Sequence, residues 1–211
     1  MADETKKSES TQASSQTATK ELPFEVPPLF GKYSFKEVVV QDPGLVKYIN
    51  LTPIFIPHSS GRYTSKAFQK SKVNIVERFV NNMMRTEHAT GEKAHMIGVV
   101  EKAFDIIEKR TKQNPIQILV KAIENSSPRE EITRLQYGGI SVPKAVDVSS
   151  ARRVDIALRN LCKGILKSSH KNKKRLEMCV ADELIAAAEN NMNSFGVSKK
   201  EEMERVAASA R

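Results

Sequence analysis

Residues 128–148, PREEITRLQYGGISVPKAVDV, interrupt the helical periodicity of the sequence around them. Side chains alternate with a period of two on both sides of Gly138-Gly139, which is the pattern of a β-hairpin with a tight turn. Neither face of this hairpin is apolar enough to be buried, and Pro143 has no N–H to donate within an inner strand. An isolated two-stranded hairpin is only marginally stable in water. We therefore expect an arm that projects from a helical body and contacts a partner.

Six helices are predicted around the hairpin, because apolar residues recur there every three to four positions. The clearest helix start is Asn114-Pro115, with Asn at the N-cap, Pro at the first helical position and Gln117 at the third. Ser198 and Glu201 have capping-box spacing and predict the start of the last helix. The expected helices are Asn74–Arg85, Lys93–Arg110, Pro115–Asn125, Ala151–Lys167, Leu176–Asn190 and Lys199–Ala208.

The pattern predicts a mainly α fold: a six-helix domain with a protruding β-hairpin between the third and fourth helices, and an extended N-terminal arm. The first helix is expected to expose Glu77, Arg78, Asn81 and Arg85. The last helix is expected to pack through Met203 and Val206.

Three regions are expected along the chain. Residues 1–20 are rich in Ser, Thr, Gln, Ala and Lys and predict a disordered tail. Residues 21–60 contain six prolines among many apolar residues, which predicts an extended extension that packs on a surface. Residues 61–211 form the helical domain, with the hairpin at 130–148.

The charge of the chain is strongly basic and unevenly placed. The formal net charge is +9, yet residues 1–60 carry six Lys/Arg against seven Asp/Glu. The positive charge therefore belongs to residues 61–211, which favours a polyanionic partner, with nucleic acid first and an anionic membrane surface second. No apolar run approaches the ~20 residues of a membrane-spanning helix, and the N-terminus lacks the apolar segment of a secretory signal.

Residues for catalysis or metal binding do not occur in a recognisable arrangement. The histidines His58, His88, His95 and His170 have no metal-ligand spacing among themselves or with a cysteine. Cys162 and Cys179 are expected to be inert core thiols in a reducing compartment. No phosphate-binding glycine loop is present. We expect neither an enzyme nor a bound cofactor or metal.

Two basic segments are candidates for phosphate binding. Within residues 151–167, Arg152, Arg159 and Lys163 fall on the side opposite the apolar residues, with Lys167 close by and Asp155 as the one acidic neighbour. Such a stripe favours a phosphate-binding face, and a solvated helix face is the alternative. Residues 62–72 interleave bases with Tyr63 and Phe68, as segments that follow a nucleic-acid backbone often do. The alternative there is a solvated linker.

Several motifs together resemble one family. They are His58-Ser59-Ser60-Gly61-Arg62-Tyr63, Asn114-Pro115-Ile116-Gln117-Ile118-Leu119-Val120-Lys121-Ala122-Ile123, Pro128-Arg129-Glu130, Ala145-Val146-Asp147-Val148-Ser149 with Arg152-Arg153-Val154, Ala181-Asp182-Glu183-Leu184-Ile185, and Glu204-Arg205-Val206-Ala207. In this order they resemble the small-subunit ribosomal protein seven family in its eukaryotic cytosolic form, known there as protein five. The resemblance covers about residues 30–211.

The resemblance implies a structural constituent of the small (40S) ribosomal subunit. It implies binding to the 3′ major, or head, domain of the small-subunit rRNA, and a part in assembling the head. It also implies a position near the exit-site tRNA, the mRNA path and neighbouring ribosomal proteins, in the cytoplasm after nuclear or nucleolar passage. The RNA-facing positions that it implies are Arg62, Lys66, Lys70, Lys72, Arg78, Lys93, Arg129, Arg134, Arg152, Arg153, Arg159, Lys163, Lys199, Lys200 and Arg205.

The hairpin departs from the family pattern. Family hairpins usually carry several arginines at the tip, whereas this one retains only Arg134 and Lys144. Tyr137 is expected either to stack on a base or to pack against a neighbouring protein.

Two other function classes compete with the ribosomal one. The chain is alternatively a helix-turn-helix regulator that reads nucleic acid with residues 151–167, although a hairpin then stands where the first helix belongs. An RNA-modifying enzyme is disfavoured, because no cofactor loop is present.

Overall fold

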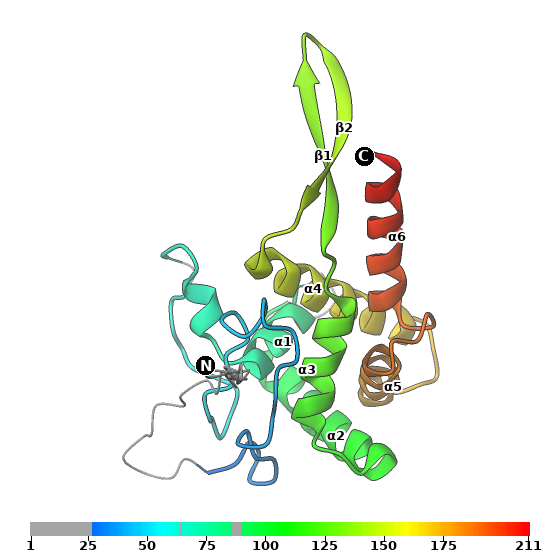
Figure 1. Ribbon diagram of the computed structural model, residues 1–211. Helices are drawn as coiled ribbons and strands as arrows, with labels where there is room; N and C mark the ends of the chain where they lie inside the picture. The colour runs from blue at the N-terminus through cyan, green and yellow to red at the C-terminus, as the bar shows by residue number, and fades with distance from the viewer. Residues whose placement is uncertain (1–26, 64, 86–89) are drawn as a thin grey trace, which may run out of the picture.

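The structure is a computed structural model that describes residues 27–63, 65–85 and 90–211. Within these ranges, six α-helices and one β-hairpin between α3 and α4 confirm the predicted fold class (Figure 1). The predicted disordered tail, residues 1–20, lies outside the described residues. The elements are the 3-10 helix η1 (Gln69–Lys72), α1 (Ile75–Met83), α2 (Lys93–Thr111), α3 (Pro115–Ser126), β1 (Glu130–Tyr137), β2 (Ile140–Asp147), α4 (Ser150–Ser169), α5 (Leu176–Ala188) and α6 (Phe195–Ser209).

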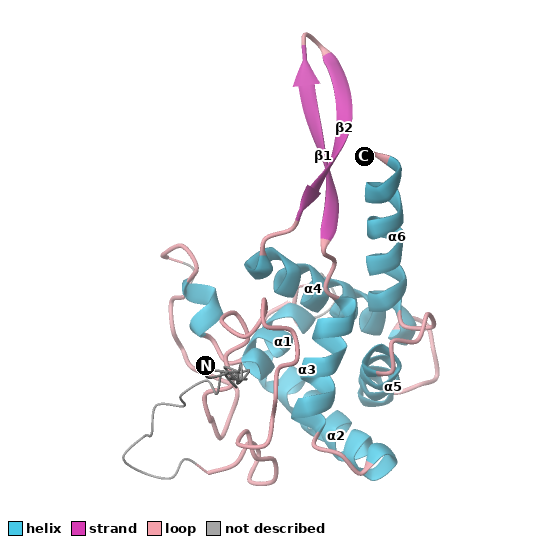
Figure 2. Ribbon diagram, viewed as in Figure 1, coloured by secondary structure: helices cyan, strands magenta, loops and turns pink. Residues whose placement is uncertain are grey.

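The hairpin stands well above the helical body (Figure 2). Its strands are antiparallel, and Tyr137 pairs with Ile140 across a two-residue turn. Gly138 and Gly139 both have positive φ, 55° and 90°, which the right-handed twist of a tight hairpin requires. The tip is exposed on both faces, as the sequence predicted. Both strands pack against α6, which lies beside the lower part of the hairpin (Figure 1).

The hydrophobic core lies between α1–α5, and α3 contributes most of its length to it. The predicted start of α3 is confirmed, since Asn114 Oδ1 accepts a hydrogen bond from the Ile116 N–H at 3.0 Å. Both cysteines are buried in this core, as expected. Burial without a charged partner raises the pKa of the Cys162 thiol, which favours the protonated thiol over the reactive thiolate.

Residues 27–60 run along the helical body and add to its core. Leu29, Tyr33 and Leu45 are buried. The Tyr33 hydroxyl donates to Asp105 on α2 at 2.7 Å, and Asn114 donates to the Ser34 carbonyl at 2.7 Å. These contacts fix the extension against α2 and the start of α3.

The last helix begins one turn earlier than predicted. Its N-cap is Ser194, whose hydroxyl accepts from the Val197 N–H, and not Ser198. The early start is favoured because Val197 is buried and Gly196 lies so close to Leu161 that an added Cβ would meet its side chain at 2.8 Å. The predicted contact through Val206 is also wrong, because that side chain is 46% exposed and the helix packs through Val197 and Ala207.

Candidate nucleic-acid interface

A cleft of about 450 Å³ lies between the 60–73 segment, α1 and α4. Four elements supply its basic side chains, and two carboxylates, Glu77 and Asp155, lie among them. The basic residues that line it are Lys70, Arg78, Arg85, Lys93 and Arg159. The fold thus brings together four of the predicted RNA-facing residues, which are separated by up to 89 positions in the sequence.

Arg78 is the most buried of these cations, and the sequence-based prediction that α1 exposes it is wrong. Its Nη2 donates to Asp155 Oδ1 at 2.8 Å and its Nη1 donates to the Tyr48 carbonyl at 2.9 Å. Burial lowers the pKa of Arg78, and the Asp155 carboxylate opposes that shift. The guanidinium is therefore used inside the protein, where it joins α1 to α4 and to the N-terminal extension.

Glu77 was also expected on the exposed side of α1, and it is buried as well. It accepts hydrogen bonds from Lys93 Nζ at 2.7 Å and from the Ser59 N–H and hydroxyl at 3.0 Å. Burial alone would raise the pKa of Glu77, but these hydrogen bonds outweigh it, so the pKa lies below its ordinary value. This carboxylate holds the start of α2 and the 58–60 turn at the edge of the cleft.

Asp155 holds a second cation at the cleft. Its other oxygen, Oδ2, pairs with Lys70 of η1. One carboxylate on α4 therefore positions both a buried arginine and an exposed lysine.

The basic stripe predicted on α4 faces solvent. Arg152, Arg159 and Lys163 are exposed, whereas the apolar side of the helix is buried. Arg159 and Lys163 form no ion pair with any described residue, which leaves their charge for an outside partner. Lys167 lies 5.5 Å from the centroid of the Phe195 ring.

Arg152 has a structural partner that the sequence did not reveal. Its Nε and Nη2 donate to the two carboxylate oxygens of Glu131, each at 2.7 Å. This bidentate pair ties the first turn of α4 to the base of β1. The hydrogen bond from Arg152 lowers the pKa of Glu131, with burial acting in the opposite direction.

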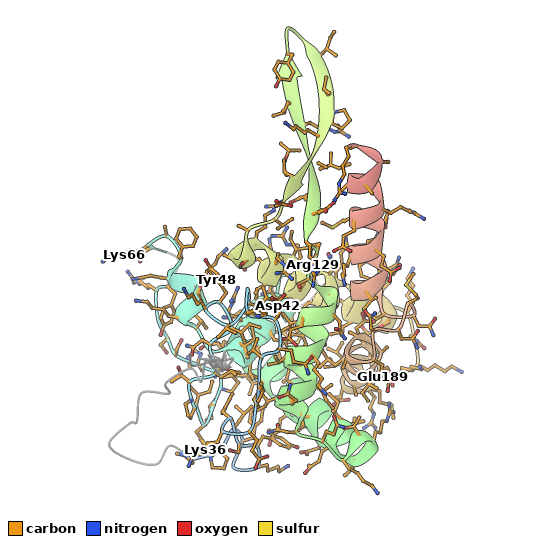
Figure 3. All side chains as sticks on the ribbon, viewed as in Figure 1. Lys36, Asp42, Tyr48, Lys66, Arg129 and Glu189 are labelled. Carbon is orange, nitrogen blue, oxygen red and sulfur yellow. The ribbon has the colours of Figure 1, made fainter. Side chains whose placement is uncertain are left out.

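A second cleft of about 480 Å³ lies at the base of the hairpin. It contains three predicted RNA-facing residues, Arg129, Arg153 and Lys200, together with acidic side chains. Figure 3 shows Arg129 and Asp42 near the base of the hairpin. Arg153 is largely buried and donates from Nη2 to Asp42 at 2.7 Å and to Ser127 at 3.1 Å, so it too is used inside the protein.

The remaining predicted residues are spread over the surface. Arg62 and Lys66 are exposed in the loop before η1, Lys72 is exposed at the end of η1, and Arg134 is exposed on β1. On α6, Lys199 pairs with Glu202, and Arg205 is exposed. The structure does not bring these into the first cleft.

Two features of the surface were missed as sites. Arg85, two residues after the end of α1, lines the first cleft beside Arg78 and Asn81. Its helical spacing from Asn81, four positions earlier, was the available signal. The exposed turn after α4, with Lys171, Lys173, Lys174 and Arg175, adds positive charge near the end of the stripe. Its signal was the run of bases itself.

The described residues contain no group of three His, Cys, Asp or Glu side chains that could hold a metal ion. None of the helices in the described ranges is both long and apolar enough to cross a membrane.

Comparison with known families matches residues 45–211 to the family described as "Ribosomal protein S7p/S5e". The chain belongs to this family. The small ribosomal subunit protein uS7 of Methanococcus aeolicus is 56% identical over 184 residues, which cover 87% of this chain and 98% of that protein. The uS7 protein of Archaeoglobus fulgidus is 56% identical over 183 residues, covering 87% of this chain and 94% of that one. The uS7 protein of Picrophilus torridus is 54% identical over 183 residues, with 87% and 98% covered.

Membership of the family confirms the resemblance seen in the motifs. It also confirms that the chain is a ribosomal protein and not an enzyme. The cationic cleft and the α4 stripe therefore belong to a protein whose family works within an RNA–protein assembly.

Proposed function

We propose that this chain is a structural constituent of the small ribosomal subunit and binds small-subunit rRNA through the first cleft and the exposed face of α4. The observation that carries the proposal is the convergence of Lys70, Lys93 and Arg159 on one cleft, beside the α4 stripe. Cations from separate elements at fixed spacing recognise the shape of folded RNA and replace its condensed counterions. The names of the archaeal relatives support the same assignment.

The second part of the proposal concerns the position of the chain within the ribosome. We assign the chain to the 40S subunit, on the 3′ major domain of its rRNA, where it helps assemble the head beside neighbouring ribosomal proteins. The hairpin projects far beyond the helical body, which supports a reach toward the mRNA path and the exit-site tRNA (Figure 1). The chain is proposed to act in the cytoplasm after nuclear or nucleolar passage.

The geometry gives less support to the regulator hypothesis. In a helix-turn-helix unit a short turn joins a first helix to the recognition helix. Here β2 ends at Asp147 and leads directly into α4, so the element before α4 is a strand.

Sedimentation tests the proposal. A lysate that contains the tagged chain is run on sucrose gradients at low and at high salt. The chain should sediment with small subunits at low salt and should be released as salt rises. Recovery of the chain at the top of the low-salt gradient, with intact subunits below, would contradict the proposal.

A further inference from the structure

Phe68 is an exposed aromatic residue in an unfavourable backbone conformation. It lies just before η1, is 69% exposed, and has a φ of 60°. A positive φ is uncommon for a bulky L-residue and is found where surrounding contacts impose it, often at binding sites. A phenyl ring this exposed gains little from burial against the residues that the structure describes.

The chain is fixed on the C-terminal side of Phe68. The Phe68 carbonyl accepts from the Ser71 N–H at 3.1 Å, which closes the tight turn. Lys70 is tied to Asp155 on α4, and the Lys72 carbonyl accepts from the Asn50 side chain. A ring on a loop held in this way loses less conformational entropy on binding than a ring on a free loop.

The charge around Phe68 points to the chemistry of its partner. Residues 58–76 contain four Lys/Arg and no Asp or Glu. Lys66 and Lys72 lie within four positions of the ring, are exposed, and form no ion pair with another described residue. Figure 3 shows Lys66 at the outer end of the loop, pointing away from the body. This combination suits a base carried on a phosphate backbone better than an apolar protein surface.

We propose that Phe68 is a stacking platform for an unpaired nucleobase of the bound RNA, with Lys66 and Lys72 holding the flanking phosphates. The inference rests on the proposed rRNA-binding function and adds a specific site to it. Aromatic rings stack on any exposed base face, so the platform selects single-stranded or bulged RNA rather than a particular sequence.

A tryptophan at this position gives a direct signal, because the chain contains no tryptophan of its own. The Phe68→Trp protein is titrated with an in vitro transcript of the 3′ major domain of small-subunit rRNA, and separately with heparin, a polyanion without bases. Stacking should quench the tryptophan emission with the transcript and leave it unchanged with heparin. Met178→Trp, at a 42% exposed position on α5, is the matched control and should respond to neither.

Affinity separates stacking from charge. Phe68→Ala should weaken binding of the transcript roughly 5- to 150-fold, the range for loss of one stacked base, with the salt dependence unchanged. Lys66→Ala/Lys72→Ala should instead make the negative slope of log K against log salt shallower by about 1.4–1.8. Phe68→Tyr should bind like the wild type, and Phe68→Leu should bind like Phe68→Ala. Circular dichroism melts confirm that each variant is folded.

Several results would overturn the inference. The first is wild-type affinity in the folded Phe68→Ala protein. The second is full binding by Phe68→Leu, which indicates a simple apolar contact with a protein. The third is equal quenching of the tryptophan emission by heparin. Each of these leaves rRNA binding intact. Failure of the wild-type protein to bind the transcript more tightly than heparin would count instead against the proposed function.

Discussion

Asp155 on α4 accepts a hydrogen bond from Arg78 on α1 at 2.8 Å, and this pair connects the core to the proposed RNA-binding face. Only 7% of the Arg78 side chain is exposed, while Asp155 keeps about a quarter of its surface. The same carboxylate pairs with Lys70 outside the core. The position of the exposed cleft therefore depends on a buried charge pair.

Removal of the carboxylate should destabilise the fold. In Asp155→Ala the Arg78 guanidinium stays buried without its charge partner, and we expect the free energy of unfolding to fall by about 2–3 kcal/mol. Urea denaturation followed by circular dichroism measures the change. The double variant Arg78→Met/Asp155→Ala should recover most of the loss, because an apolar side chain of similar length needs no partner. A loss below about 0.5 kcal/mol in the single variant, the range of an ordinary surface change, would show that the pair does not support the fold.

Glu77 should make the free energy of unfolding depend on pH in the acidic range. Its pKa in the folded chain lies below the ordinary value of 4.5, so its contribution is complete above pH 4.5 and is lost as the pH falls through the lower folded pKa. Glu77→Gln should lower the free energy of unfolding at pH 7 by about 1–2 kcal/mol and flatten its fall below pH 4.5. Denaturation from pH 3 to 7 measures both effects. Glu189→Gln is the control, because it makes the same change at an exposed glutamate. An equal flattening in that variant would refute the role of Glu77.

The start of α6 can be tested with two serines four residues apart. The Ser194 hydroxyl accepts from the Val197 N–H and donates to Glu183 at 2.7 Å. We expect Ser194→Ala to lower the free energy of unfolding by about 1–2 kcal/mol, as loss of an N-cap does. Ser198→Ala, in the exposed first turns of the helix, should change it by less than about 0.5 kcal/mol. The reverse order of effects would restore Ser198 as the cap.

Local chemistry explains which elements could be predicted from the sequence. Gly138-Gly139 favours a tight turn through its own backbone freedom. Asn114-Pro115 starts α3 with a cap contact to a residue only two positions away. Both predictions held because the required contacts are close in sequence.

The errors come from contacts between distant segments. Helical spacing places Arg78 on the polar side of α1, but the N-terminal extension and α4 cover that side, and its partner Asp155 is 77 positions away. The capping-box spacing at Ser198 is a valid local signal, yet burial of Val197 against the body decides the start of α6. Arg152 was placed correctly on the α4 surface, but its pairing with Glu131 depends on how the hairpin packs relative to α4, which local spacing does not indicate.

The central claim is that the exposed face of α4 neutralises RNA phosphates, and the salt dependence of binding tests it most directly. Arg159 and Lys163 are the residues to change, because Arg152 is already paired with Glu131. The control is Lys109→Ala/Lys112→Ala, which removes the same charge at the C-terminal end of α2, far below the hairpin in Figure 1. Both proteins are compared with the wild type on the 3′ major domain transcript. We predict that Arg159→Ala/Lys163→Ala makes the negative slope of log K against log salt shallower by about 1.4–1.8, from two lost phosphate contacts, while the control keeps the wild-type slope. An unchanged slope in the folded α4 variant, or an equal fall in both variants, would contradict the account and leave the α4 stripe as a solvated helix face.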